Sequence, residues 1–155
     1  MNRPADPMLS MSNAVAAQIL LVEDNPLDVR LTREALKERN VLVSMSVADN
    51  GVDAMAFLRR EDRHADAPRP DLILLDLNLP RMDGREVLMQ IKQDPKLNQI
   101  PVVILTTSDA DQDILKCYDQ HANCYVVKPL ELEQFFRVVA QIEGFWLTVV
   151  ALPAG

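Results

Sequence analysis

The chain of 155 residues is long enough for one domain with a hydrophobic core of its own. Hydrophobic residues at 48% and charged residues at 25% are typical of a globular protein, and the formal net charge of −7 argues against nucleic-acid binding. No basic amphipathic helix predicts binding to a membrane, and residues 1–16 lack the basic start and apolar centre of a signal peptide. We therefore expect a cytoplasmic protein with a flexible tail at 1–16 and with no nucleic-acid or membrane partner.

Short apolar runs alternate along the chain with segments of helical periodicity, which is typical of a doubly wound α/β protein. In the first half, the predicted elements are a buried strand at 19–22, a helix from Asn25-Pro26 to about Arg39, a half-buried strand at 41–47, a helix opening at Asn50-Gly51 and a surface loop at 61–70. In the second half, they are a buried strand at 72–75, a helix at 85–93, a strand ending at Thr106, a helix capped by Ser108 or Asp109, a strand at 124–127 and a last helix after Lys128-Pro129. The pattern predicts a (βα)5 three-layer sandwich of the flavodoxin-like kind around a five-stranded parallel sheet.

Four of the apolar runs end on residues that a metal and phosphate site needs. Glu23-Asp24 follow the first run, Asp76 follows the run at 72–75, and Thr106 and Lys128 follow the last two. Because ligands bind beyond the carboxyl ends of the strands in open parallel sheets, we expect these side chains to converge. Each residue alone has a plain structural explanation, such as a helix cap, but coincidence at four strand ends is a poor account.

The chemistry of these residue types favours phosphoryl transfer to a carboxylate. Crowded carboxylates repel each other unless a cation relieves them, and Mg²⁺ prefers one or two carboxylates together with phosphate oxygens and water. With Mg²⁺ bound, Asp76 can act as a nucleophile and form an aspartyl phosphate. Lys128 then supplies positive charge to the phosphoryl oxygens, and the hydroxyl of Thr106 can donate a hydrogen bond to one of them.

These positions together resemble the receiver domain of response regulators, the CheY type. The resemblance covers roughly 18–142 and depends on Glu23-Asp24, the loop at 76–84, Thr106 and Lys128-Pro129. It implies a signalling protein rather than an enzyme, in which Asp76 accepts phosphate from a histidine kinase. The resemblance also implies a domain at 17–144.

The family resemblance assigns further roles around Asp76. Asp24 would bind Mg²⁺ directly, Glu23 through water, and Asn78 through its backbone carbonyl. The Lys128–Pro129 peptide bond would be cis, and Asn78 and Ser108 stand at positions that tune the lifetime of the acyl phosphate. After phosphorylation Thr106 would be drawn to the phosphate and Tyr125 would move inward. The alternative is that Tyr125 packs at the surface at the end of a strand without a switching role, but its spacing of three residues before Lys128 favours the switch.

The C-terminal region carries more apolar surface than one packed helix face needs. Leu132, Phe135 and Val139 are expected to face the core. Four other side chains are harder to bury and are candidate contacts of a homodimer that forms through the face of the C-terminal helix, namely Phe136, Phe145, Trp146 and Leu147. The alternative is that the extension at 145–155 folds back on its own domain.

The long loop before Asp76, the loop at 77–84 and the ending at 144–147 resemble one subgroup of receivers. These are stand-alone regulators that pair with phytochrome-type histidine kinases and form homodimers through their C-terminal faces. A sensor histidine kinase, of the bacteriophytochrome type in this interpretation, is therefore the expected partner.

Two alternatives belong to other functional classes. A phosphohydrolase of the haloacid-dehalogenase type also uses an aspartate nucleophile, Mg²⁺, threonine and lysine, but it needs a second aspartate two residues after the first. That position is Asn78 here, and an amide cannot transfer the proton. A receiver-like binding module that works without phosphorylation is disfavoured because the acidic, threonine and lysine positions are all intact.

Overall fold

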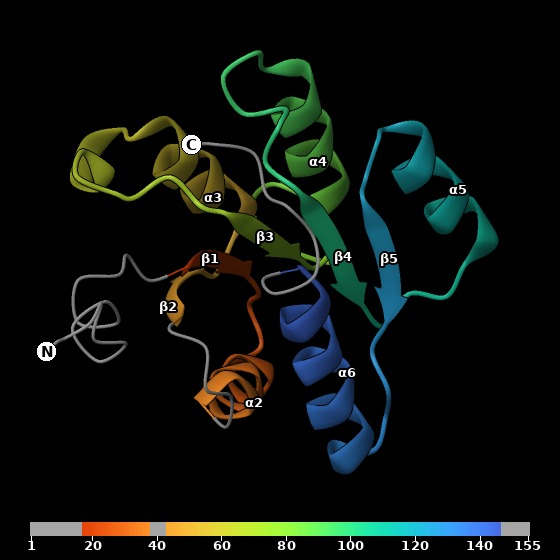
Figure 1. The fold of residues 1–155 in the computed structure, drawn as a ribbon. Helices are drawn as coiled ribbons and strands as arrows, with labels where there is room; N and C mark the ends of the chain where they lie inside the picture. Colours follow the sequence, from red (N-terminus) through yellow and green to blue (C-terminus); the bar gives the residue numbers. More distant parts are fainter. Residues whose placement is uncertain (1–16, 38–42, 147–155) are drawn as a thin grey trace, which may run out of the picture.

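The computed structural model describes residues 17–37 and 43–146, and Figure 1 shows their arrangement. Five parallel strands form one sheet, as predicted, and their order is β2-β1-β3-β4-β5. The strands are β1 (Ala17–Val22), β2 (Val43–Ala48), β3 (Leu72–Leu75), β4 (Val102–Thr106) and β5 (Cys124–Val127). The helices are α2 (Pro26–Lys37), α3 (Gly51–Arg59), α4 (Gly84–Gln93), α5 (Asp111–Asp119) and α6 (Leu132–Gly144), with a short 3-10 turn at Asp62–His64.

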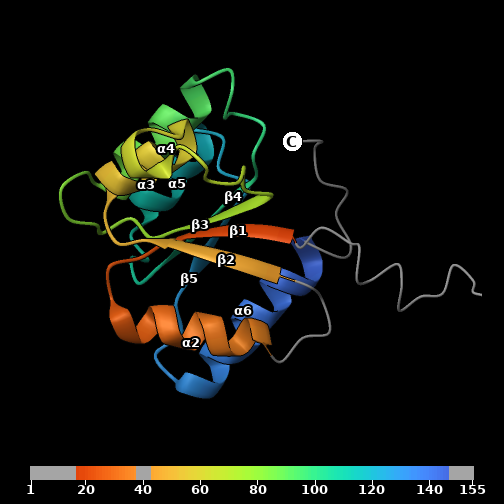
Figure 2. The same ribbon diagram turned by 90° about the vertical axis from the view of Figure 1, so that its left-hand side faces the viewer.

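The sheet is the middle layer of three. Figure 2 shows α3, α4 and α5 on one side of it and α2 and α6 on the other. Side chains alternate between the two sides along each strand, so Leu20 and Val22 pack toward α3 and α4 while Ile19 and Leu21 pack toward α2 and α6. Every residue of the central strand β3 is buried, which explains why its sequence is a continuous apolar run.

Side chains cap several helices where the sequence predicts it. The side chain of Asn25 accepts hydrogen bonds from the backbone at the start of α2, and the side chain of Asn50 accepts one from the backbone N–H of Asp53 at 2.8 Å. The prediction that Ser108 or Asp109 caps the next helix is wrong. Helix α5 begins at Asp111 with Ala110 before it, because the Ser108 hydroxyl instead donates to the side chain of Asp113 at 2.7 Å.

Some apolar side chains of α5 and α6 lie differently from expectation. Phe135 and Val139 are buried as predicted, but Leu132 is 54% exposed because it stands in the first turn of α6, beyond the sheet. In α5 the buried residue is Cys117, whereas Leu115 is exposed. The exposed ring of Tyr118 reaches β5, where its hydroxyl oxygen accepts a hydrogen bond from the backbone N–H of Tyr125 at 3.1 Å.

The dimer candidates differ from one another in burial. Phe136 and Trp146 are half-buried and pack against the core on the α2 and α6 side of the sheet. Phe145 is 53% exposed, and its ring lies edge-on to that of Trp146. Leu147 lies outside the described residues, as do the tail at 1–16 and most of the extension at 145–155. None of the helices within the described part of the chain has the length and hydropathy to span a membrane.

Gly84 begins α4 directly behind the end of β3. A Cβ atom at this position would lie 2.1 Å from the backbone oxygen of Asp76 and 2.7 Å from the Cα atom of Leu77. These are backbone atoms at the centre of the sheet, so they cannot move aside without shifting the strand end that carries Asp76.

We expect Gly84→Ala to destabilise the protein by about 1–3 kcal/mol, as overpacking in a dense core does. Helix propensity alone predicts that the substitution stabilises the protein, since alanine is favoured over glycine in a helix by roughly 1 kcal/mol. The free energy of unfolding in urea measures the difference, with Gln93→Ala at an exposed position of the same helix as the control. A stability equal to or above that of the wild type would contradict the steric argument.

Candidate metal and phosphate site

The carboxyl ends of the strands bring the predicted acidic residues together. Glu23 and Asp24 follow β1, and Asp76 follows its neighbour β3. One carboxylate oxygen from each of the three lies within 4.8 Å of the other two. The predicted convergence of these three side chains is therefore confirmed.

Burial divides the acidic residues into two kinds. Glu23 and Asp76 are buried, with exposed fractions of 3% and 7%, while Asp24 is exposed. Buried carboxylates in contact cannot all be ionised without a nearby cation. A cluster of oxygen ligands that is open to solvent on one side suits a hard divalent ion such as Mg²⁺, which keeps several of its waters.

Lys128 supplies the positive charge inside this cluster. Lys128 follows β5 and is buried. Its Nζ atom donates hydrogen bonds to three carboxylates: that of Glu23, Asp28 Oδ2 at 2.9 Å and Asp76 Oδ2 at 3.1 Å. Burial by itself would lower the pKa of the ammonium group, but the hydrogen bonds to Asp28 and Glu23 and the negative charges of Glu23 and Asp76 outweigh it and raise that pKa. Lys128 is therefore fully charged at neutral pH and offsets the carboxylates when no metal ion is bound.

Asp28 is a member of the site that the sequence did not reveal. It lies in the first turn of α2, where an acidic residue already has a role because it complements the helix dipole. Three residues after the capping Asn25, it also matches the ordinary acidic position of a capping pattern. These local explanations hide its contact with Lys128, which is one hundred residues away in the sequence.

Burial and the negative charge of Asp76 raise the pKa of Glu23 to about 7, although the contact with Lys128 acts in the opposite direction. Below this pH the carboxyl group of Glu23 holds a proton that a metal ion must displace. We expect Mg²⁺ to bind about tenfold more weakly at pH 6 than at pH 8, as calorimetric titration would measure.

The matched variant for this pH dependence is Glu23→Gln. It should bind Mg²⁺ more weakly than the wild type at pH 8, yet with little change in affinity between the two pH values. Equal affinity of the wild-type protein at pH 6 and pH 8 would contradict a proton on Glu23 that competes with the metal.

Thr106 and Ser108 lie on the neighbouring strand end. Thr106 ends β4 and is fully buried, and its hydroxyl oxygen accepts a 3.4 Å hydrogen bond from the backbone N–H of Ser108. The hydroxyl of Tyr125 donates to the backbone carbonyl of Ser108 at 2.9 Å, and the ring is half-buried against the core. Tyr125 is thus tied to the loop after Thr106 rather than packed loosely on the surface.

An ion pair that the sequence did not reveal contacts the loop after Thr106, on the side of α5. Both carboxylate oxygens of Asp113 on α5 accept hydrogen bonds from the guanidinium of Arg85 on α4, each at 2.8 Å. These bonds, with that from the Ser108 hydroxyl, lower the pKa of Asp113 to about 2. The two residues are far apart in the sequence and belong to no motif, so only the fold brings them together.

Two further predictions concern the loops around Asp76. Asn78 is exposed, and its backbone N–H donates to Asp76 Oδ1 at 3.3 Å. The predicted cis bond before Pro129 is wrong, because the structure has no cis peptide bond among its described residues. A Lys-Pro sequence does not enforce the cis form, since the trans form of such bonds is favoured by about 0.5–1 kcal/mol.

Comparison with known proteins places these residues in a family context. Residues 19–140 match the response regulator receiver domain family. The chain is 50% identical to the response regulator Rcp1 of Synechocystis sp. over 136 residues, which cover 88% of this chain and 92% of Rcp1.

Solved structures give the same picture. The phosphorylated cyanobacterial phytochrome response regulator RcpA superposes with a TM-score of 0.88 at 51% identity, over 90% of this chain and all of that one. The Mn²⁺-bound form of Rcp1 superposes with a TM-score of 0.87 at 49% identity, over 89% of this chain and 99% of that one. A phosphorylated and a metal-bound structure are thus both similar in fold to the arrangement described above.

Proposed function

Because this chain belongs to the response regulator receiver domain family, we propose that Asp76 accepts a phosphoryl group from the histidine of a sensor kinase in a Mg²⁺-dependent reaction. The observation that carries the proposal is the position of the Asp76 carboxylate, which lies beside the acidic residues that follow β1 and contacts the ammonium group of Lys128. The protein is a signalling protein, and we propose that it acts without catalytic turnover of a substrate.

In the proposed reaction, a carboxylate oxygen of Asp76 attacks the phosphorus atom of the phosphohistidine. An O–P bond forms, the P–N bond to the imidazole breaks, and the imidazole nitrogen keeps the electron pair and takes a proton. Glu23, Asp24 and Asp76, with the backbone carbonyl of Asn78, would hold Mg²⁺, which neutralises charge on the phosphoryl oxygens when it is bound.

Lys128 would change partners during the reaction. Its ammonium group now contacts three carboxylates, those of Glu23, Asp28 and Asp76. A phosphoryl group on Asp76 carries more negative charge than the carboxylate did and would attract the ammonium group more strongly. Asp28 would then hold Lys128 close to Asp76 in the unphosphorylated protein, so that it needs to move little.

The proposed switch runs from Thr106 to Tyr125. A phosphoryl oxygen would accept a hydrogen bond from the Thr106 hydroxyl, which is now an acceptor for the backbone N–H of Ser108. Movement of Thr106 would shift the loop to which Tyr125 is tied through the Ser108 carbonyl. The equilibrium can shift only by as much as phosphate differs in affinity for the two conformations. Asn78 and Ser108 would tune the lifetime of the acyl phosphate.

We propose that the kinase partner is of the phytochrome type, which the similarity to the phytochrome regulator RcpA supports. The reaction would take place in the cytoplasm, where histidine kinases draw phosphate from ATP. The receiver domain would span 17–144.

Transfer of labelled phosphate from purified kinases tests this proposal. With Mg²⁺ present, we expect rapid labelling from a phytochrome-type kinase and none when EDTA removes the metal. A small-molecule phosphodonor such as acetyl phosphate provides the comparison. Failure with the kinase alone would overturn the phytochrome pairing, and failure with every donor, on folded protein, would overturn the phosphoacceptor function.

The homodimer through the C-terminal helix face is also a proposal, and the exposed ring of Phe145 supports it. We expect Phe145→Ala to weaken self-association by about tenfold or more, a typical loss for an aromatic anchor in an interface. Sedimentation equilibrium measures the dissociation constant, and Leu115→Ala, an exposed apolar side chain on α5, is the control. A monomeric wild type, or equal dissociation constants for both variants, would contradict this dimer.

A further inference from the structure

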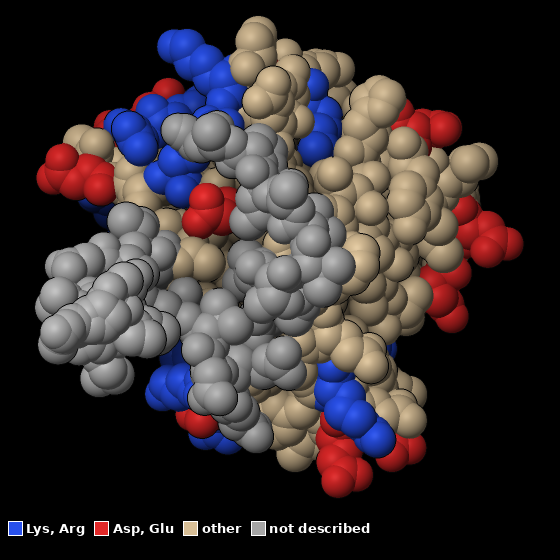
Figure 3. Space-filling view, viewed as in Figure 1, with Lys and Arg blue, Asp and Glu red and all other residues tan. Residues whose placement is uncertain are grey.

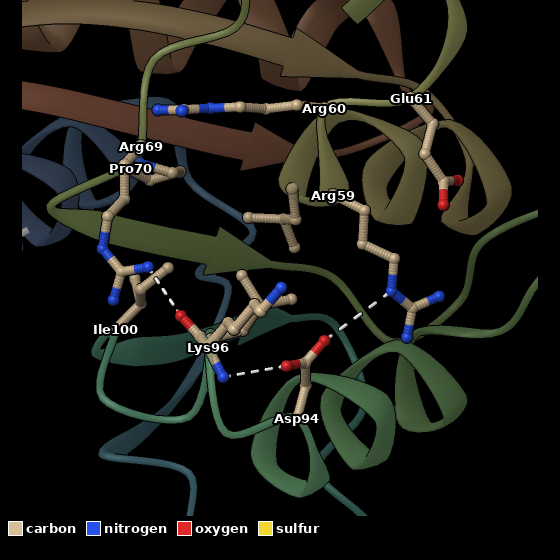
Figure 4. Close-up of a pocket in the computed structure, with 10 residues that line it drawn as sticks. Arg59, Arg60, Glu61, Arg69, Pro70, Asp94, Lys96 and Ile100 are labelled. Carbon is tan, nitrogen blue, oxygen red and sulfur yellow. Dashed lines mark hydrogen bonds and ion pairs between the residues drawn. The ribbon is translucent and has the colours of Figure 1, made fainter. Parts of the chain in front are cut away.

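A cavity of about 590 Å³ lies at the end of the sheet opposite Asp76. It opens between the end of α3, the segment that leads into β3 and the turn between α4 and β4, as Figure 4 shows. Glu23, Asp24, Asp76, Thr106 and Lys128 lie at the carboxyl ends of strands, whereas this cavity lies where β3 and β4 begin. Its volume is that of a site for a small organic molecule.

The floor of the cavity consists of apolar side chains. The side chains of Leu58, Leu97 and Ile100 line it and are themselves buried in the core between the sheet and the helices α3 and α4. Pro70, also buried, completes this surface. These side chains keep only a small exposed area, so the gain from an apolar or aromatic ligand body comes mainly from removing the body's own apolar area from water.

The rim of the cavity is basic, in contrast to the chain as a whole. Four cations line it, Arg59, Arg60, Arg69 and Lys96, against two carboxylates, while the chain has a formal net charge of −7. Figure 3 shows basic side chains gathered over the region of α3 in this view. The positive charge of the rim attracts anions, although the negative net charge of the whole molecule repels them.

The cations at the rim differ in whether they form ion pairs. Within the described part of the chain, neither Arg60 nor Lys96 forms an ion pair, and Arg59 Nε lies 3.8 Å from Asp94 Oδ2. Arg69 donates from one terminal nitrogen to the backbone carbonyl of Lys96 at 2.6 Å, which fixes its guanidinium at the rim. Figure 4 shows Arg60 extending toward Arg69 and Pro70, and Glu61 pointing away from both arginines.

The backbone at Arg60 sets where its side chain leaves the end of α3. Arg60 ends α3 in the left-handed region, with a φ angle of 57°, where glycine is the favoured residue. A side chain in this conformation costs roughly 1–2 kcal/mol. The Arg60 side chain runs along one edge of the cavity toward Pro70 (Figure 4), where a glycine would leave no cation.

We propose that this cavity binds a small organic phosphate, with the phosphate group held by Arg60 and Arg69 and an apolar or aromatic body on the floor of Leu58, Leu97 and Ile100. Guanidinium groups match the oxygens of phosphate in pairs of hydrogen bonds, and a doubly charged phosphate balances the excess positive charge of the rim better than a single carboxylate does. The site does not depend on the phosphoryl transfer proposed for Asp76.

The test is a titration of the isotopically labelled, full-length protein with 1-naphthyl phosphate, followed by amide NMR. We expect saturable shifts at Arg60, Leu97 and Ile100. Inorganic phosphate should bind more weakly, because it lacks the aromatic part of 1-naphthyl phosphate. The double variant Arg60→Gln and Arg69→Gln should raise the dissociation constant at least about tenfold, the loss expected for charge-assisted hydrogen bonds. Arg33→Gln, an exposed position on α2, should leave it unchanged.

Three results would overturn the proposal. They are the absence of saturable shifts around the cavity, equal affinity of the double variant and the wild type, and equal affinity for inorganic phosphate and 1-naphthyl phosphate. A parallel titration of Asp76→Asn separates this site from the strand-end site, because the cavity shifts should persist in that variant. If shifts appear only around residue 76 and vanish in the Asp76→Asn variant, the ligand binds at the strand-end site, and the proposed cavity site is wrong.

Discussion

Asp76→Asn is expected to abolish labelling by phosphorylated kinase and by acetyl phosphate, down to background. The amide differs little in size from the carboxylate but lacks the negatively charged oxygen that must attack phosphorus. The fold should persist, because Lys128 keeps its contacts with Glu23 and Asp28 when the charge at position 76 is removed. Gel transfer of radiolabel, with melting curves to show that the variant is folded, measures the result.

The matched control is Asp71→Asn, at the other end of the same strand. Asp71 directly precedes β3 and accepts a 2.8 Å hydrogen bond from the backbone N–H of Gln18, a bond that the asparagine oxygen can also accept. This variant should be labelled at the wild-type rate. Labelling that survives in Asp76→Asn would move the phosphoacceptor to another residue, and loss in both variants would point to a general effect of charge or folding.

Lys128→Met is expected to cause the largest loss of stability, about 3–5 kcal/mol in EDTA at neutral pH. Removal of one partner from a buried ion pair leaves the other charges without compensation, and losses of this size follow. Here three carboxylates lose their shared cation, while methionine fills a similar volume. The free energy of unfolding in urea measures the loss, with the exposed Lys37→Met at the end of α2 as the control.

Mg²⁺ should restore most of the stability that Lys128→Met loses. A ligand that binds only the folded state adds about 2.7 kcal/mol at one hundred times its dissociation constant. The variant should gain more from Mg²⁺ than the wild type does, because the ammonium group no longer competes for the same carboxylates. An equal gain in both proteins would mean that Lys128 and the metal do not share ligands.

The parts of the fold that depend on local pattern could be predicted from the sequence. The central strands are continuous apolar runs because they are buried on both faces, and the residues at their ends lie together because all the strands point the same way. Glu23, Asp24 and Asp76 could be placed at one spot from these two facts alone. Thr106 and Lys128 occupy the predicted strand ends as well.

Features that depend on contacts between distant side chains could not be predicted. The ion pairs of Asp28 with Lys128 and of Arg85 with Asp113 join residues whose local sequence already explains them. The start of α5 was misplaced because Ser108 bonds a side chain rather than the helix backbone. The bond before Pro129 was misassigned from family resemblance, since nothing in the residues themselves selects the cis form.

The bond between Tyr118 and the backbone of Tyr125 has a consequence for how copies of this chain can meet. β5 is an outer strand of the sheet with four residues, and its unpaired N–H groups could otherwise recruit a strand from another molecule. The Tyr118 hydroxyl occupies one of these donors from within the same molecule. Extension of the sheet across two molecules is thereby disfavoured, and association on this side is left to the packing of side chains.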